Sequence, residues 1–294
     1  FFFFSSGGIG RKMGSTTKNI LVTGGNTGIG YALCEQLVTE CGCQVYLGSR
    51  NAERGQKAVD DIKAANPDAA DRLELLLIDV SDDDSVKTAA AEMKTKGISL
   101  YALVNNAGIG FQTASDVDAM LRTNFYGPRR VSEAFVSMIQ DGGRIVNVSS
   151  GAASMWLRTQ SDEKKKFFSS SDTTWEELRA AVEKDKHTTA SMGVYGLSKA
   201  ALTAYTIQQA VQYPNLVCTS LSPGYVATNM TAGYGAPLTP EQATVSLKKC
   251  LFGEVGSGYY YGSDGIRSPL TVTRDPGTPE YKGEENPDAS RYNK

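Results

Sequence analysis

Histidine is nearly absent from this chain, which contains only His187 among 294 residues. A zinc site built on histidines is therefore excluded, and a serine–histidine–aspartate hydrolase would have to use this one residue. No nucleophile-elbow motif accompanies it, so we expect His187 to be a surface residue. The five cysteines are irregularly spaced, and we expect no metal site.

The chain also lacks a long apolar run, a disulfide pattern and a strong charge of either sign. No stretch approaches the roughly 20 apolar residues of a membrane span, and the four phenylalanines at the start are too few for a signal peptide. Lys and Arg number 30 against 32 Asp and Glu, so we expect no nucleic-acid partner. An odd number of cysteines fits a reducing compartment, and we expect a cytoplasmic protein without membrane partners.

Short apolar runs alternate with helical patterns from residue 19 onward. Strands are predicted at 19–23, 44–48, 73–78, 100–104, 144–148 and 216–221. Helices are predicted at 28–40, 52–65, 83–96, 116–140 and 192–212. Continuous apolar strands separated by helices are typical of βαβ units. The sequence therefore predicts an α/β fold with a doubly wound, mostly parallel sheet.

A single domain is expected over residues 17–273. Residues 1–16 are expected to be an N-terminal extension that is either disordered or artefactual, with Met13 as a candidate true start and residues 1–12 as an upstream artefact. Residues 274–294 are rich in Pro, Gly and acidic residues, which indicates an irregular or loosely attached tail. Residues 151–191 show no strand pattern and are expected to form a helical insertion.

Within this insertion, the pattern over 175–184 predicts a helix capped at Asp172 or Thr173.

A glycine-rich turn follows the first predicted strand and opens the first helix. Gly24 allows a sharp turn, Gly28 allows a pyrophosphate to approach the helix N-terminus, and Gly30 allows close packing of helix on strand. Together they predict a dinucleotide site. The turn residues expected to bind the cofactor are Gly24, Asn26, Thr27, Gly28, Ile29 and Gly30.

The spacing of these glycines resembles the short-chain dehydrogenase/reductase family, whose fingerprint is Thr-Gly-x-x-x-Gly-x-Gly. Further segments similar to the family follow in the same order over roughly residues 17–262. The resemblance implies one seven-stranded Rossmann domain. It also implies cofactor contacts at Asp79, Val80, Asn106, Ala107, Gly108, Tyr195, Lys199, Pro223, Gly224, Val226 and Thr228.

The end of the second predicted strand favours NADP(H) over NAD(H). An acidic residue here would bind the ribose hydroxyls and repel a 2′-phosphate. Ser49 is neutral, and Arg50 offers the bidentate donors that bind phosphate. Two points leave the choice open: Arg50 also fits an ordinary surface charge, and Thr27 stands where many NADP-dependent members carry a basic residue.

Tyr195 and Lys199 lie four residues apart, which places them on one face of the predicted helix. A nearby cation favours the phenolate, so we expect the pKa of Tyr195 to fall from about 10 towards about 7. Ser150 is expected to hydrogen-bond a carbonyl and stabilise developing alkoxide charge, with Ser149 as the alternative. By resemblance, Asn124 holds a water that links Lys199 to solvent, and Lys199 also binds the nicotinamide ribose.

Ser150 and Tyr195 lie 45 positions apart, farther than in most members of the family. A long insertion here resembles the carbonyl reductase branch, in which the inserted helices cover the dimerisation surface, and this implies a monomer. Four aromatic residues of the insertion either line the substrate entrance or fix the insertion to the body: Trp156, Phe167, Phe168 and Trp175.

These observations predict NADPH-dependent reduction of a small-molecule ketone, aldehyde or quinone, with Tyr195 as proton donor. Two alternatives remain open at this point. The same residues suit NAD-linked alcohol oxidation, and a non-catalytic dinucleotide-binding regulator would share the glycine turn.

Overall fold

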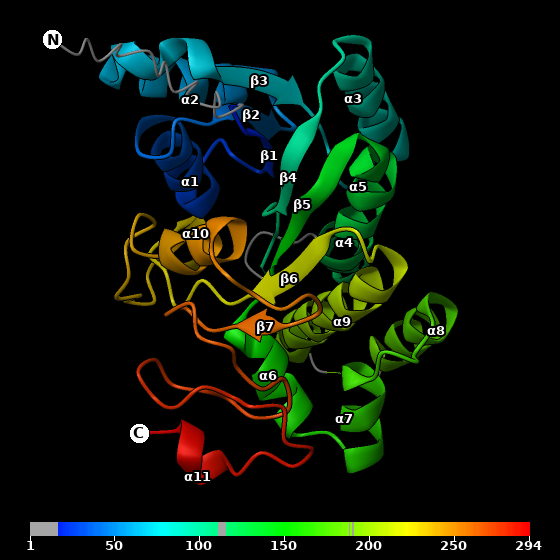
Figure 1. The fold of residues 1–294 in the computed structure, drawn as a ribbon. Helices are drawn as coiled ribbons and strands as arrows, with labels where there is room; N and C mark the ends of the chain where they lie inside the picture. The colour runs from blue at the N-terminus through cyan, green and yellow to red at the C-terminus, as the bar shows by residue number, and fades with distance from the viewer. Residues whose placement is uncertain (1–16, 111–115, 188, 190) are drawn as a thin grey trace, which may run out of the picture.

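The computed structural model describes residues 17–110, 116–187, 189 and 191–294; the expected extension at 1–16 lies outside them. Its centre is a seven-stranded sheet in the order β3-β2-β1-β4-β5-β6-β7, in which every neighbouring pair is parallel (Figure 1). The strands are β1 Asn19–Thr23, β2 Gln44–Ser49, β3 Leu73–Leu77, β4 Leu100–Asn105, β5 Ile139–Val148, β6 Val217–Leu221 and β7 Tyr260–Tyr261. The strand order reverses between β1 and β4, where open α/β sheets bind ligands at the carboxyl ends of their strands.

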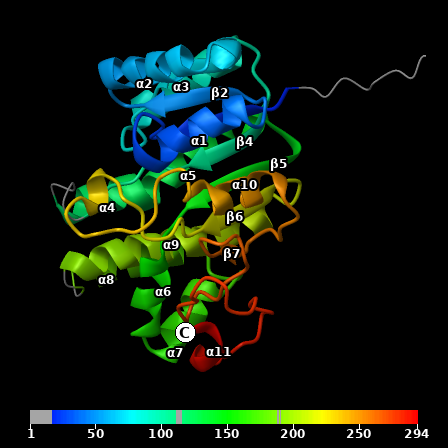
Figure 2. The same ribbon diagram turned by 90° about the vertical axis from the view of Figure 1, so that its left-hand side faces the viewer.

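Helices cover both faces of the sheet, as Figures 1 and 2 show. The helices are α1 Gly28–Thr39, α2 Ala52–Ala65, α3 Asp83–Thr95, α4 Val117–Leu121, α5 Gly127–Phe135, α6 Gly151–Arg158, α7 Asp162–Ser169, α8 Trp175–Asp185, α9 Ser191–Gln212, α10 Thr244–Phe252 and α11 Ala289–Tyr292. On β1, Ile20 and Val22 face α1, α2 and α10, while Leu21 faces α3 and α5. The strands are apolar on both sides because both sides are buried.

The predicted doubly wound, single-domain α/β fold is confirmed, and the described sheet is parallel throughout. The strand at 19–23 and the helix at 52–65 have the predicted bounds. No described helix is long and apolar enough to span a membrane.

The single helix predicted at 116–140 is wrong. Helix α4 passes into a π-helical turn at Arg122–Tyr126, then into α5 and a 3-10 turn at Val136–Met138. Strand β5 already begins at Ile139, because Ile139 pairs with Leu100 of β4. An apolar helical pattern does not reveal this tertiary pairing.

The insertion contains helices α6, α7 and α8. Thr174 caps α8 by a capping box with Glu177, so the caps expected at Asp172 or Thr173 are wrong. Helix α8 lies against α9 and the α4–α5 segment. Its Trp175 ring lies 4.9 Å from the ring of Phe125, and the Arg129 guanidinium stacks on the same indole at 3.8 Å.

The other aromatic residues of the insertion also pack inward. Trp156 is 8% exposed and meets the fully buried Phe168 with ring centroids 5.3 Å apart. Phe167 lies 5.5 Å from Phe168. Of the two interpretations of these residues, the structure favours the one in which they fix the insertion to the body.

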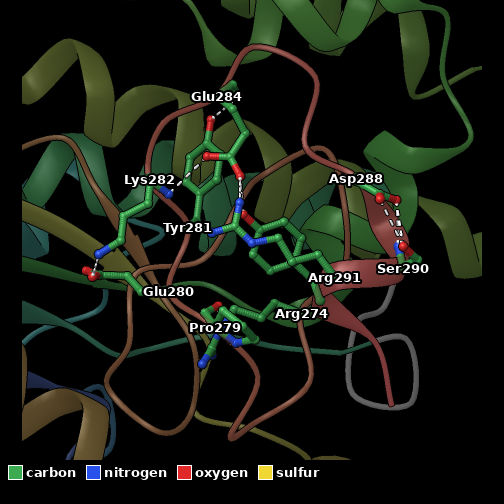
Figure 3. A network of polar contacts seen from close by, with 10 residues as sticks. Arg274, Pro279, Glu280, Tyr281, Lys282, Glu284, Asp288, Ser290 and Arg291 are labelled. Atoms are coloured by element: carbon green, nitrogen blue, oxygen red, sulfur yellow. Dashed lines mark hydrogen bonds and ion pairs between the residues drawn. The ribbon is translucent and has the colours of Figure 1, made fainter.

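The C-terminal tail is held to the body by a buried ion pair. The Arg274 guanidinium donates to both carboxylate oxygens of Asp264 at 2.9 Å, and its side chain is 1% exposed. Farther along, Tyr292 is fully buried, and Arg291 pairs with Glu284 at 2.8 Å near the surface (Figure 3). Most of the tail is irregular in backbone, but it is not loosely attached.

We predict that Arg274→Ala destabilises the protein by about 3 kcal/mol, because it leaves the Asp264 carboxylate without its cation. Arg291→Ala is the matched control: its side chain is 44% exposed, and such pairs contribute about 1 kcal/mol or less. Urea unfolding followed by circular dichroism measures both. Equal small losses for the two variants would contradict the anchoring role of Arg274.

Candidate active site

The glycine turn has the geometry of a cradle for a large anion. Gly24 and Gly28 adopt positive φ values of 66° and 56°, which favour glycine. A Cβ on Gly24 would lie 2.9 Å from the Ala107 Cα, and one on Gly30 would lie 2.4 Å from the Gly24 carbonyl oxygen. Close backbone approach therefore requires glycine at positions 24 and 30, and the positive φ of Gly28 favours glycine there. Thr27 is the N-cap residue of α1, and its side chain makes no capping bond among the described residues, so the first N–H groups of the helix have no partner from this cap.

Hydrogen bonds join this turn to the segment after β4. The Thr23 hydroxyl accepts from the N–H groups of Asn106 at 3.0 Å and Ala107 at 3.1 Å. The Asn106 amide donates in return to the carbonyls of Thr23 at 2.8 Å and Gly24 at 3.2 Å. The predicted cofactor residues 106–108 thus lie beside the glycine turn.

The residues after β2 and β3 lie on the other side of the turn. Arg50 is exposed directly after β2, whereas Ser49 is 2% exposed and bonds the Asn51 backbone. The Asp79 carboxylate accepts from the N–H of Ser81 at 2.9 Å. Val80 is buried, and its carbonyl accepts from Arg130 at 2.7 Å.

The loop after β6 folds back over the glycine turn. Gly224 has a φ of 92°, and Val226 forms a β-bridge with Leu238. A Cβ on Gly28 would lie 3.2 Å from the Thr228 methyl group, so the two segments nearly touch. Residues Pro223 to Thr228 therefore close one side of the cradle.

The predicted catalytic residues meet at the carboxyl end of β5. Tyr195 and Lys199 share one face of α9, with the Lys199 Nζ 5.8 Å from the centroid of the tyrosine ring. Tyr195 forms a side-chain hydrogen bond with Ser150, the N-cap residue of α6. The Lys199 ammonium donates to the Val148 carbonyl at 2.9 Å.

Ser149 and Ser150 point to different partners. The Ser149 hydroxyl donates to the Lys199 carbonyl at 3.0 Å and lies 2.8 Å from the hydroxyl of Thr203, both on α9. Ser150 is instead half-buried, as Tyr195 is, and its side chain interacts with that of Tyr195. The geometry therefore favours Ser150 over the alternative Ser149.

Asn124 lies in the π-helical turn and holds the segment after β4. Its side chain accepts from the Ile109 N–H at 2.9 Å and donates to the Ile109 carbonyl at 2.8 Å. A Cβ on Gly108 would lie 3.3 Å from the Asn124 Oδ1 and 3.5 Å from the Lys199 Nζ. Asn124, Gly108 and Lys199 are thus close neighbours.

Burial dominates the ionisation of the pair on α9. It raises the pKa of Tyr195, an effect that the hydrogen bond from Ser150 only partly offsets. It lowers the pKa of Lys199 to about 8. The expected fall of the Tyr195 pKa is therefore not found in this structure, in which burial raises that pKa and the Lys199 ammonium donates to the Val148 carbonyl.

Two residues that the sequence did not single out also contact this region. Ser222, directly before the Pro223-Gly224 pair, accepts a hydrogen bond from the Gly151 N–H at 3.0 Å. Tyr260 on β7 forms side-chain hydrogen bonds with Ser222 and Ser154. In the sequence, only the position of Ser222 beside the Pro223-Gly224 pair could have indicated that it belongs to the site. No sequence feature distinguished Tyr260 from the tyrosines next to it.

Comparison with known proteins identifies the family. The family model described as short chain dehydrogenase matches residues 18–161. Carbonyl reductase (NADPH) 1 of Homo sapiens is 31% identical over 251 residues, which are 78% of this chain and 89% of that protein. The chain belongs to the short chain dehydrogenase family.

Other members of the short chain dehydrogenase family match over similar lengths. (+)-Neomenthol dehydrogenase of Arabidopsis thaliana is 29% identical over 286 residues, covering 84% of this chain and 96% of that protein. The structure of salutaridine reductase from Papaver somniferum superposes with a TM-score of 0.74 at 27% identity, covering 83% and 99% of the two chains. The fold and the family predicted from the sequence are confirmed.

Among the described residues, no three or more His, Cys, Asp or Glu side chains lie together in an arrangement that could hold a metal ion.

The lowered pKa of Lys199 gives a stability prediction. The unfolded chain binds more protons than the folded protein between about pH 8 and the usual lysine pKa of 10.5, so this group favours unfolding below about pH 8 and the penalty disappears as pH rises through that window. We predict that Lys199→Met stabilises the cofactor-free protein at pH 7 by on the order of 1–3 kcal/mol.

Urea unfolding of parent and variant at pH 7 and pH 9.5 tests this, since the difference between them isolates Lys199 from other titrating groups. We expect the free energy of unfolding of Lys199→Met to exceed that of the parent at pH 7, and we expect this difference to be smaller at pH 9.5. A variant less stable than the parent at pH 7 would mean that the buried ammonium is a net stabilising group.

Proposed function

We propose that this protein reduces ketones, aldehydes or quinones to alcohols with NADPH. The observation that carries the proposal is the meeting of Tyr195, Ser150 and Lys199 at the end of β5, beside the glycine cradle after β1. The names of its relatives, a carbonyl reductase and a neomenthol dehydrogenase, point to the same chemistry.

A dinucleotide fits the residues present. Gly24 and Gly30 have no room for a Cβ and Gly28 has a positive φ, so the turn stays narrow, and the α1 N-terminus offers N–H groups without a side-chain cap for a pyrophosphate. Arg50 is exposed at the end of β2, where it is free to bind a 2′-phosphate. The neutral Ser49 would not repel that phosphate.

NADPH supplies the hydride when it is bound. The hydroxyls of Ser150 and Tyr195 then bind the carbonyl oxygen and stabilise its developing charge. Because burial raises the pKa of Tyr195, its phenol is protonated near neutral pH and can donate the proton that completes the alcohol. Lys199 binds the ribose next to the nicotinamide, and the segment around Asn124 returns a proton from solvent.

We also propose that the protein is a cytoplasmic monomer. Helix α8 covers the α4–α5 segment through Trp175 and through the Lys186 ion pair with Asp118 at 2.6 Å. The helices beneath α8 are then closed to a second copy. All five cysteines are free thiols, which fits a reducing compartment.

We predict that Tyr195→Phe lowers kcat for carbonyl reduction by at least about a hundredfold, because it removes the proton donor. Tyr205→Phe is the matched control, since Tyr205 is buried on the same helix and its hydroxyl has no hydrogen-bond partner among the described residues. NADPH absorbance is followed with α-dicarbonyls, such as diacetyl, and quinones, such as menadione.

Three outcomes of these assays would contradict the proposed carbonyl reduction or support one of the two alternative functions. Activity that survives in Tyr195→Phe contradicts the proposed proton donor. A parent protein that binds NADPH tightly but reduces none of the carbonyls is a regulator. A parent that turns over alcohols with NAD only is an NAD-linked dehydrogenase.

We predict that Arg50→Asp shifts the cofactor preference from NADPH towards NADH by tenfold or more in kcat/KM, about 1.4 kcal/mol or greater, because an acid repels the 2′-phosphate. Lys94→Asp makes the same charge change at an exposed site near the far end of α3 and should leave the preference unaltered. An unchanged ratio in Arg50→Asp would refute its role.

A further inference from the structure

The hydroxyl of Ser222 touches both halves of the candidate site. Its Oγ accepts hydrogen bonds from the Gly151 N–H at 3.0 Å and the Gly224 N–H at 3.3 Å. Gly151 directly follows Ser150, and Gly224 belongs to the loop that closes the cofactor cradle. One side chain therefore bridges the serine turn and the cofactor loop.

This bridge begins where the backbone ladder of the sheet ends. The last ladder contact between the two segments is the Ser149 N–H bond to the Leu221 carbonyl at 2.8 Å. Beyond it the chains after β5 and β6 diverge, one into α6 and the other into the loop at 223–228. The Ser222 side chain continues the connection that the backbone no longer makes.

The rotation of the Ser222 hydroxyl is also constrained. A hydroxyl has two acceptor lone pairs and one hydrogen, and the two N–H groups occupy the lone pairs. The hydrogen is left for another acceptor, and the side chain of Tyr260, which interacts with those of Ser222 and Ser154, is the candidate. Tyr260 is 5% exposed and Ser222 is 9% exposed, so water competes little for these bonds.

We propose that Ser222 is a positioning residue that sets the separation between the serine turn and the cofactor loop, and that Tyr260 orients its hydroxyl. The inference rests on the proposed function, because it takes Ser150 as the carbonyl-binding hydroxyl and residues 223–228 as the cofactor loop. A displaced turn would move the Ser150 hydroxyl from the carbonyl oxygen, and small displacements of catalytic groups reduce rates strongly.

The test is a kinetic comparison of variants with NADPH and diacetyl. Ser222→Ala is expected to lower kcat at saturating NADPH by about tenfold to a hundredfold and to weaken NADPH binding severalfold, measured by quenching of protein fluorescence. Ser150→Ala should lower kcat but leave NADPH binding unchanged. Tyr260→Phe retains the ring volume and should show the Ser222→Ala effects in smaller degree.

Ser220→Ala is the matched control. Ser220 lies on β6, two residues before Ser222, and is fully buried, and its hydroxyl has no hydrogen-bond partner among the described residues. Its loss should change neither kcat nor NADPH affinity by more than about twofold.

The double variant Ser150→Ala/Ser222→Ala shows whether Ser222 acts through Ser150. We expect kcat within about twofold of Ser150→Ala alone, since the group being positioned is already gone. A full additional loss in the double variant, or unchanged kcat and NADPH affinity in Ser222→Ala, would overturn the proposal.

Failure of the proposed function gives a different pattern. Full activity in Ser150→Ala would show that Ser150 does not bind the carbonyl oxygen. The NADPH affinity of Ser222→Ala would still show whether Ser222 positions the cofactor loop. If circular dichroism shows Ser222→Ala to be unfolded, the comparison rests on Tyr260→Phe. Parental kcat and NADPH affinity in that variant would reject the proposal.

Discussion

The contact between strand β5 and helix α9 holds the candidate site together. The Asn147 amide on β5 donates to the Thr206 hydroxyl at 2.9 Å and the Gln209 carbonyl oxygen at 2.7 Å, both on α9. About two turns before Thr206 on α9, the Lys199 ammonium donates to the Val148 carbonyl at 2.9 Å. Because β5 lies between β4 and β6 inside the sheet, these bonds fix α9 to a rigid base. The distances among the candidate catalytic residues Ser150, Tyr195 and Lys199 depend on that registration.

Holding a lysine in this contact is unfavourable for the fold. Lys199 is 4% exposed, and burial lowers its pKa to about 8. A structural role alone would be served by an apolar residue at this position. A buried ionisable group of this kind is typical of functional sites, which is consistent with the role proposed for Lys199.

The parts of this molecule set by local pattern were predictable, and the parts set by tertiary contact were not. Apolar runs at 19–23 and the glycines of the first turn required only local chemistry. The early start of β5 at Ile139 depends on pairing with Leu100, which no helical periodicity reveals. The composition of the tail indicated loose attachment, because composition does not show that Arg274 forms a buried ion pair with Asp264. The direction in which the pKa of Tyr195 shifts likewise depends on burial, which the spacing of residues in the sequence does not reveal.

We propose that Tyr195 and Ser150 together bind the carbonyl oxygen of a substrate beside the nicotinamide. A crystal structure of the complex with NADP⁺ and a ketone would show this contact. We expect the carbonyl oxygen to lie within about 3.2 Å of both the Tyr195 Oη and the Ser150 Oγ, with the ribose against Lys199. A ketone bound with its oxygen out of reach of Tyr195, or a dinucleotide bound away from Gly24, would contradict it.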